Sequence, residues 1–241
     1  MKVLSIDLDY FMSPTIELYN SLLYDKNPSV RWKKLFDNTH FKENHLIIDQ
    51  SNLLFCFDVF LKALKNCDNV SFGYEHDAIL YGIKNFSNID LINIDHHDDV
   101  LGGDYANEMN YNRALSKEYD EVVKFEKVHE GNWISWLASH NKINSCVWIG
   151  SKNSLSKDRN YFNEKIIPNY TNVEKEEYKF ENFDFDFIFV CLSPQYVPKN
   201  HWHYFKMFIS TYEQFKEKDA IIINRKHEHE FRYSKLKFSN L

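Results

Sequence analysis

The chain has 241 residues, which is long enough for one large α/β domain, and we expect a single domain over residues 1–241. Its net charge of −6 and its scattered Lys and Arg residues argue against a nucleic-acid partner, because phosphate binding needs a concentrated basic surface. There is no apolar run long enough to span a bilayer, and the segment before the first aspartates is too short and too acidic for a signal peptide, so we expect no membrane association.

The first half of the chain predicts three strands and one helix. The first strand is Lys2 to Leu8, an apolar run. Leu53 to Lys65 has apolar residues at helical spacing and is followed by polar turn residues. Val70 to Phe72 is a short second strand, and Ile89 to Ile94 is the third.

The second half predicts one helix and three further strands. Asn132 can cap a helix that continues to about His140. The apolar runs Cys146 to Ile149, Phe185 to Leu192 and Ala220 to Ile223 are predicted strands. Residues 151–184 are polar and lack periodicity, so we interpret them as a long excursion or lid over the site.

Strands that alternate with helices indicate parallel βαβ units, so the predicted fold is a three-layer α/β/α sandwich with a mainly parallel sheet. Ligands of such folds bind beyond the carboxyl ends of the strands. Ionisable residues follow three of the predicted strands at these ends. They are Asp7 and Asp9, then His76, then the run Asp95-His96-His97-Asp98-Asp99.

Alternation along an extended segment sends Asp95, His97 and Asp99 to one side and the two residues between them to the other. Four carboxylates beside two imidazoles repel one another unless cations neutralise them. Oxygen and nitrogen ligands without a thiolate favour Mn²⁺ or Fe²⁺, and the excess of carboxylates favours two ions. The predicted metal ligands are Asp7, Asp9, His76, Asp95, His97 and Asp99.

These motifs resemble those of the arginase and agmatinase family. Asp95 to Asp99 resembles its Asp-x-His-x-Asp signature, Ser5 to Asp9 its Ser-x-Asp-x-Asp signature, and Gly73 to His76 its Gly-Gly-Asp-His turn. Gly131-Asn132 resembles a Gly-Asn loop of the family more weakly. The Ser-x-Asp-x-Asp element normally follows the other two but opens this chain, as in a circular permutation, and the resemblance covers roughly the first 100 residues.

The resemblance implies an arginase/deacetylase-like fold that holds two Mn²⁺ ions per chain. Asp7 and Asp95 would bridge the ions, His76 and Asp99 would complete one site, and His97 and Asp9 the other.

The family's Ser/Thr-rich loop that grips a free amino acid is not recognisable after Asp99. The chain therefore resembles the peptide arginases of ribosomal natural-product biosynthesis, which modify a precursor peptide after translation. This resemblance implies a hydrolase that converts arginine side chains in an arginine-containing precursor peptide to ornithine, with release of urea. The sequence leaves open whether the protein forms a homo-oligomer.

One predicted ligand, Asp99, is also expected to act as general acid and base in the reaction. Four further residues are candidates for the reaction. A carboxylate should pair with the guanidinium, and Glu75 and Glu130 are the candidates. His129 is a candidate proton shuttle, and Asn132 is a candidate substrate-binding residue.

Other interpretations stay open. A free-guanidine ureohydrolase of the arginase or agmatinase type, a single-zinc acyl-amide deacetylase and a non-catalytic metal-binding protein are the alternative functions. His201-Trp202-His203 and His227-Glu228-His229 have metal-like spacing but no neighbouring acidic cluster, so we expect them to be solvated. The four isolated cysteines are predicted to be reduced core residues of a cytoplasmic protein.

Overall fold

The computed structural model of the chain describes residues 1–13, 28–38, 45–100, 128, 130–152, 154, 167–225 and 231–233. Its main sheet has the strand order β10-β9-β4-β8-β1-β5-β6-β7. The seven strands from β9 to β7 are parallel, and β10 pairs with β9 in the antiparallel sense. The strands of this sheet are β1 (Lys2–Asp7), β4 (Val70–Gly73), β5 (Ile89–Asp95), β6 (Ile143–Gly150), β7 (Tyr170–Val173), β8 (Phe187–Cys191), β9 (Ile221–Arg225) and β10 (Phe231–Tyr233).

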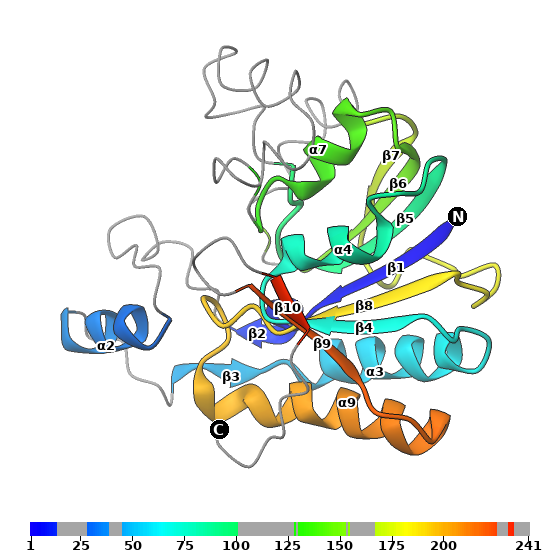
Figure 1. Cartoon of the computed structure of the whole chain (residues 1–241). Helices are drawn as coiled ribbons and strands as arrows, with labels where there is room; N and C mark the ends of the chain where they lie inside the picture. The colour runs from blue at the N-terminus through cyan, green and yellow to red at the C-terminus, as the bar shows by residue number, and fades with distance from the viewer. Residues whose placement is uncertain are drawn as a thin grey trace.

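Helices lie on both faces of this sheet (Figure 1). The described helices are α2 (Pro28–Asn38), α3 (Gln50–Leu64), α4 (Leu80–Ile83), α7 (Trp133–Ser139) and α9 (Trp202–Lys216). Short 3₁₀ turns are η1 (Leu8–Phe11), η3 (His76–Ile79) and η5 (Lys199–His201), and β2 (Met12–Ser13) pairs with β3 (Ile47–Ile48). In Figure 1, α3 and α9 run along one side of the sheet, and α4 and α7 lie on the other.

Alternating side chains of the strands build a separate core on each face. In β1, Leu4 and Ile6 pack in the core that includes α3 and α9, whereas Val3 packs in the core that includes α4 and α7. The period of two in a strand produces this division. Both faces of the central strands are therefore buried, which explains why they appear in the sequence as continuous apolar runs.

The pairing register brings the carboxyl ends of three strands to the same level. Asp7 at the end of β1 and Gly73 at the end of β4 both pair with Cys191 of β8, which lies between these strands. Ile6 pairs with Ile94 of β5, so Asp95 is level with Asp7. The three segments that carry the predicted ligands therefore all begin at the carboxyl end of the parallel sheet.

The strands predicted from the sequence are present with small shifts of their ends, and the helix at residues 53–65 is α3, which begins three residues earlier. Asp49 caps α3 by accepting a hydrogen bond from the Asn52 backbone nitrogen at 3.0 Å. Asn132 occupies the N-cap position of α7, but its side chain makes no capping hydrogen bond.

The interpretation of residues 151–184 as one irregular excursion is wrong in part. Residues 170–173 form β7, the edge strand of the sheet, which pairs with β6 through Tyr170 and the next three residues. A strand with polar residues at this place is compatible with the edge of a sheet, because one of its sides has no neighbouring strand.

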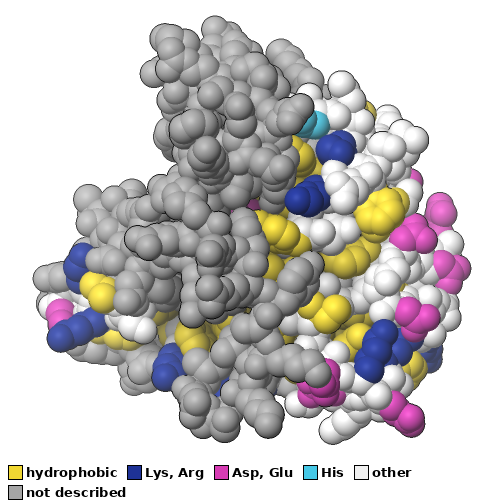
Figure 2. Space-filling view, in the orientation of Figure 1, with side chains coloured by type: hydrophobic (Ala, Val, Ile, Leu, Met, Phe, Trp, Pro, Cys, Tyr) yellow, Lys and Arg dark blue, Asp and Glu magenta, His cyan; other side chains and the backbone are white. Residues whose placement is uncertain are grey.

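Two observations concern the membrane and nucleic-acid partners that the sequence argues against. Among the described residues, no helix combines the length and the apolar character that crossing a membrane requires. On the face shown in Figure 2, the described Lys and Arg side chains lie in separate small groups among acidic and neutral ones.

Candidate metal centre

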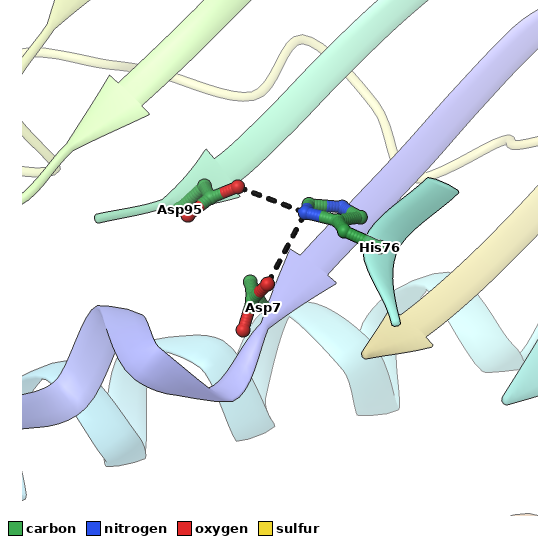
Figure 3. A group of neighbouring side chains, drawn as sticks. All are labelled: Asp7, His76 and Asp95. Carbon is green, nitrogen blue, oxygen red and sulfur yellow. Dashed lines mark ion pairs between the residues drawn. The ribbon is translucent and has the colours of Figure 1, made fainter. Parts of the chain in front are cut away.

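Three carboxylates converge on one nitrogen of His76. Two of them, Asp7 and Asp95, are drawn with His76 in Figure 3. Nδ1 of His76 lies 3.1 Å from Oδ2 of Asp7, 2.9 Å from Oδ2 of Asp95 and 2.8 Å from Oδ2 of Asp99. An imidazole nitrogen carries at most one proton, so it cannot donate to three oxygens. Nδ1 is buried and, among the described residues, has no partner in hydrogen-bond geometry. Four ligand atoms that face one another in this way are typical of ligands around a cation.

A second group forms around His97. Its Nδ1 lies 2.8 Å from Oδ2 of Asp9 and 3.9 Å from Oδ1 of Asp95. Oδ2 of Asp9 is also buried, and the described residues offer it no hydrogen bond. Because Asp95 faces His76 with Oδ2 and His97 with Oδ1, the two groups share one carboxylate.

The end of β1 brings both of its aspartates into the centre. Asp7 is the N-cap of η1, and its Oδ1 accepts a hydrogen bond from the Asp9 backbone nitrogen at 3.0 Å. The 3₁₀ turn that follows directs Asp9 back over the sheet edge, where its Oδ1 accepts a bond from the His96 backbone nitrogen at 3.3 Å. The capped turn η1 therefore places both Asp7 and Asp9 at the site.

The residues that follow β5 reach the site through a turn. Beyond Asp95 the strand ends, and the His97 backbone nitrogen donates to Oδ1 of Asp95 at 2.8 Å. Asp99 has a φ of 53°, a left-handed conformation that few L-residues adopt. The expected convergence of Asp95, His97 and Asp99 is thus present, but the expected extended geometry is wrong.

His96 and Asp98, expected on the opposite side, are both buried. The His96 ring is hydrogen-bonded to Oγ of Ser151 at 2.7 Å, and Oδ1 of Asp98 accepts a bond from the Val100 backbone nitrogen at 3.3 Å. These hydrogen bonds stabilise the turn that carries Asp95, His97 and Asp99.

The sequence interpretation missed the polar side chains that surround these ligands. Ser193 Oγ donates to Oδ2 of Asp7 at 2.5 Å, Trp133 Nε1 donates to Oδ2 of Asp99 at 2.5 Å, and Ser5 Oγ lies 2.6 Å from Nε2 of His76. Asn93 Nδ2 donates to Oδ2 of Asp95 at 3.3 Å. The available signals were Ser193 directly after a predicted strand and a buried Asn within β5, which needs a polar partner.

Burial and mutual repulsion shift the protonation of the carboxylates. Burial, followed by the charges of Asp7 and Asp95, raises the pKa of Asp9 to about 7. Burial, followed by the charges of Asp99 and Asp7, raises the pKa of Asp95 to about 7, and burial raises the pKa of Asp99. The centre therefore resists full ionisation unless positive charge is added.

His76 supplies part of that positive charge. Burial alone would lower its pKa, but the charge of Asp99 and the close approach of the Asp7, Asp95 and Asp99 oxygens raise the pKa well above the usual value. Burial likewise opposes ionisation of Asp7, yet its interactions with His76 lower its pKa. A single imidazolium against four carboxylates leaves an excess of negative charge that a divalent cation would balance.

The donor set fits metal ions of one class. The two groups are Asp7-His76-Asp95 and Asp9-Asp95-His97, and within each group the oxygen and nitrogen ligand atoms lie within 4.8 Å of one another. No thiolate takes part in either group. All four cysteines are buried and unpaired, as predicted. Carboxylate and imidazole ligands suit Mn²⁺ or Fe²⁺ better than a structural zinc ion.

Of the predicted substrate residues, Glu75 is the N-cap of η3 next to His76, and Glu130 and Asn132 lie in the turn before α7. All three are partly buried. The candidate proton shuttle His129 lies outside the described residues.

The pair His201 and His203 does not join the centre. His201 Nε2 is hydrogen-bonded to the Leu46 carbonyl at 3.2 Å, and His203 Nδ1 to the Asn200 carbonyl at 2.8 Å. Neither belongs to a metal-binding group among the described residues. Residues 227–229 lie outside the described part of the chain.

No protein family, curated protein or solved structure matches the chain at a significant level. What the structure itself establishes is a parallel α/β sheet with two overlapping buried His/Asp groups at its carboxyl edge. The arginase resemblance is therefore a proposal that stands on the residues and their geometry.

Proposed function

We propose that the protein is a binuclear manganese hydrolase of the arginase type that converts arginine side chains of a precursor peptide to ornithine and urea. The observation that carries this proposal is Asp95, whose two carboxylate oxygens face His76 and His97 respectively. Two adjacent ion sites joined by a carboxylate are the arrangement that two-metal hydrolases use.

The permuted motif order agrees with this architecture. The Asp-x-Asp element of β1 and the Asp-x-His-x-Asp element of β5 belong to neighbouring parallel strands in register. Whether the first motif opens the chain or follows the second, the same sheet edge receives both. Strand adjacency, and not chain order, decides which side chains meet.

A bound metal pair would supply the Lewis acid that activates water at neutral pH. The protein's own contribution to proton transfer falls to Asp99. Its Oδ2 is engaged by the Trp133 indole and faces His76, so the proposal assigns the proton to Oδ1. Water adds to the guanidinium carbon, the bond from that carbon to the side-chain nitrogen breaks, urea leaves, and the proton passes to the ornithine amine.

The substrate would approach from the His97 side. The His97 side chain is 25% exposed, whereas the side chains of Asp7, Asp9, His76, Asp95 and Asp99 are nearly inaccessible. Burial on the other sides keeps bulk water away from the reacting carbon. Glu75 and Glu130 remain the candidates for pairing with the guanidinium, Asn132 for contacting the substrate, and His129 for proton transfer.

Mass spectrometry tests the proposal. An arginine-containing peptide and free arginine are incubated separately with Mn²⁺-loaded protein, and with a His97→Ala variant as the control. A loss of about 42 Da per arginine in the peptide, seen with the intact protein alone, is the expected result of urea release.

The same loss on free arginine alone would make the protein an ordinary ureohydrolase. No change on either substrate, with two ions bound, would overturn the ureohydrolase proposal. A deacetylase with one zinc ion needs a single ligand group, so the presence of two overlapping groups favours the binuclear hydrolase. Stoichiometric Mn²⁺ without turnover on any amidine or amide would instead indicate a binding protein.

A further inference from the structure

The turn that follows β8, residues 193–197, contacts both His/Asp groups of the candidate centre. At its start, Ser193 Oγ donates a hydrogen bond to Oδ2 of Asp7. Further along, the Tyr196 ring lies against the His97 ring, with 4.5 Å between the centroids. The His97 side chain is 25% exposed, so Tyr196 lies on the side from which we expect the substrate to approach.

The first residue of this turn is anchored to the sheet. The Ser193 backbone nitrogen donates to the Tyr74 carbonyl at 3.0 Å, directly beyond the paired residues of β4 and β8. The Ser193 carbonyl accepts bonds from the backbone nitrogens of Tyr196 and Val197, both at 2.9 Å. Ser193 has a φ of 47°, a left-handed conformation that closes the turn tightly. Ser193 is therefore held by the sheet as well as by Asp7.

Two tryptophan side chains hold the rest of the turn. Trp32 Nε1, from α2, donates to the Pro194 carbonyl at 2.9 Å. Trp202 Nε1, from α9, donates to the Val197 carbonyl, also at 2.9 Å. These two carbonyls lie on either side of Tyr196 in the chain, so the two bonds fix the backbone from which the Tyr196 ring projects.

Trp32 connects the turn to a helix that is distant in the sequence. It lies 162 residues before Pro194 and is buried. Its ring stacks on Phe36, with 5.7 Å between the centroids, and it packs in the same core as Leu35. In Figure 1, α2 lies on the side of the sheet to which the parallel strands point. A buried indole nitrogen needs an acceptor, so the bond to Pro194 ties α2 to the substrate side of the centre.

We propose that Trp32 is a positioning residue for the substrate. Through the Pro194 carbonyl it holds Tyr196 where the ring contacts the guanidinium group of the arginine side chain, a cation that favours an aromatic face. This contact forms when the substrate binds and persists through the reaction, so its loss raises KM and leaves kcat unchanged. The inference rests on the proposed function, and its first test measures the turn and not turnover.

Hydrogen exchange tests the structural step without substrate. Trp32→Phe keeps an aromatic ring in the core but removes the indole donor. The amides of Tyr196 and Val197 should then exchange about fivefold faster, the factor that corresponds to one hydrogen bond. The amide of Leu192 should exchange at the wild-type rate, because it donates to the Gly73 carbonyl in the sheet.

Steady-state kinetics with an arginine-containing peptide test the functional step. Trp32→Phe should raise KM about fivefold, change kcat by less than about twofold and keep two Mn²⁺ ions per chain. In a protein that already carries Tyr196→Ala, Trp32→Phe should have no further effect on KM, because residues that act through one contact are not additive.

Trp136→Phe is the matched control, because Trp136 lies in α7 with its ring against His140. It should leave both the exchange rates and the kinetics unchanged. Circular dichroism verifies that each variant is folded. If Trp32→Phe does not fold, 3-benzothienylalanine at position 32 takes its place, because it keeps the shape of the indole and has sulfur instead of the N–H group.

Unchanged exchange of the Tyr196 and Val197 amides would overturn the inference, and so would additive effects of Trp32→Phe and Tyr196→Ala on KM. A fall in kcat with loss of bound Mn²⁺ would overturn it as well, since the turn would then act through Ser193 and the ligands. If the peptide reacts equally well with Trp32→Phe and with the wild type, only this inference fails. If the wild type releases no urea from the peptide, the proposed function fails with it.

Discussion

Oδ2 of Asp95 lies 2.9 Å from Nδ1 of His76, close enough for both atoms to bind the same ion. The second oxygen of the same carboxylate is directed to the other ligand group, where His97 is the imidazole. A shared carboxylate keeps two cations close together while reducing their mutual repulsion. We therefore expect the two proposed ion sites to depend on Asp95 more than on any single histidine.

Replacing Asp95 should cost the protein both ions. Asp95→Asn keeps the size of the side chain but removes its charge and one ligand oxygen, so neither group remains complete. Metal analysis after desalting should find less than about 0.2 ions per chain, as expected when a ligand common to both sites is lost. Asp90→Asn is the control, because Asp90 lies at the other end of β5 and accepts bonds from Ser145 and Asn144. Two retained ions in Asp95→Asn would contradict the bridging role.

The stability of the metal-free protein should fall as pH rises from about 5 to about 8. In the folded protein, the pKa values of Asp9 and Asp95 are raised to about 7 from an ordinary value of 3.8. The folded state thus holds more protons than the unfolded state across this window, and raising the pH favours unfolding. The raised pKa of His76 acts in the same direction, because its stabilising charge is lost at higher pH.

Mn²⁺ should reverse this trend, because it replaces the protons that these groups hold. Melting temperatures measured with chelator and with Mn²⁺ should separate increasingly as pH rises through this window. A constant separation from about pH 5 to about pH 8 would show that ligand protonation does not compete with metal binding.

Gly73 should tolerate no side chain. A Cβ there would lie 2.5 Å from Cζ of Phe189, whose ring stacks on His76 with 6.1 Å between centroids. Gly73→Ala should therefore lower the free energy of unfolding by about 1–3 kcal/mol and also weaken Mn²⁺ binding. Urea denaturation and a metal titration measure the two effects.

Gly82→Ala provides the comparison. Its Cβ would lie 2.2 Å from Cζ of Phe187, at the opposite end of β8 from the centre. It should destabilise the fold without changing metal affinity once the folded fraction is considered. Equal metal affinities of the two variants would argue against a role for Phe189 in supporting His76.

Tyr196 should affect the substrate and not the metal. Its ring lies against His97 on the exposed side of the centre, and aromatic faces attract cationic groups such as guanidinium. Tyr196→Ala should lower kcat/KM for an arginine peptide by about tenfold, equivalent to loss of one moderate cation–aromatic contact, while two ions remain bound. Tyr196→Phe, which keeps the ring, should resemble the wild type. Unchanged kinetics in Tyr196→Ala would show that Tyr196 does not contribute to substrate binding.

Much of this fold was predictable because its central strands are buried on both faces. Runs such as Phe187 to Cys191 are apolar enough to be recognised without tertiary information. Strand β7 was missed because its short polar segment, beginning at Tyr170, becomes a strand by pairing with β6 at the sheet edge. Helix α9 was missed although its buried residues, Phe205, Phe208, Ile209 and Tyr212, have the i, i+3, i+4, i+7 spacing of an amphipathic helix.

The predicted ligands were found from residue type and spacing, since ionisable residues directly after apolar strands have little use in packing. Their geometry was not predictable. Asp99 turns toward His76 through a left-handed backbone conformation that no spacing rule anticipates. The hydrogen bond from Trp133 to Asp99 depends on how α7 packs at the carboxyl end of the sheet, which the sequence does not specify.

Crystallography with data collected on both sides of the manganese absorption edge tests the central claim most directly. Crystals grown from Mn²⁺-loaded protein should show two anomalous peaks, one beside His76, Asp7 and Asp99 and one beside His97 and Asp9, with Asp95 between them. A fully loaded crystal without anomalous density at these residues would contradict the binuclear centre on which the proposed hydrolase depends.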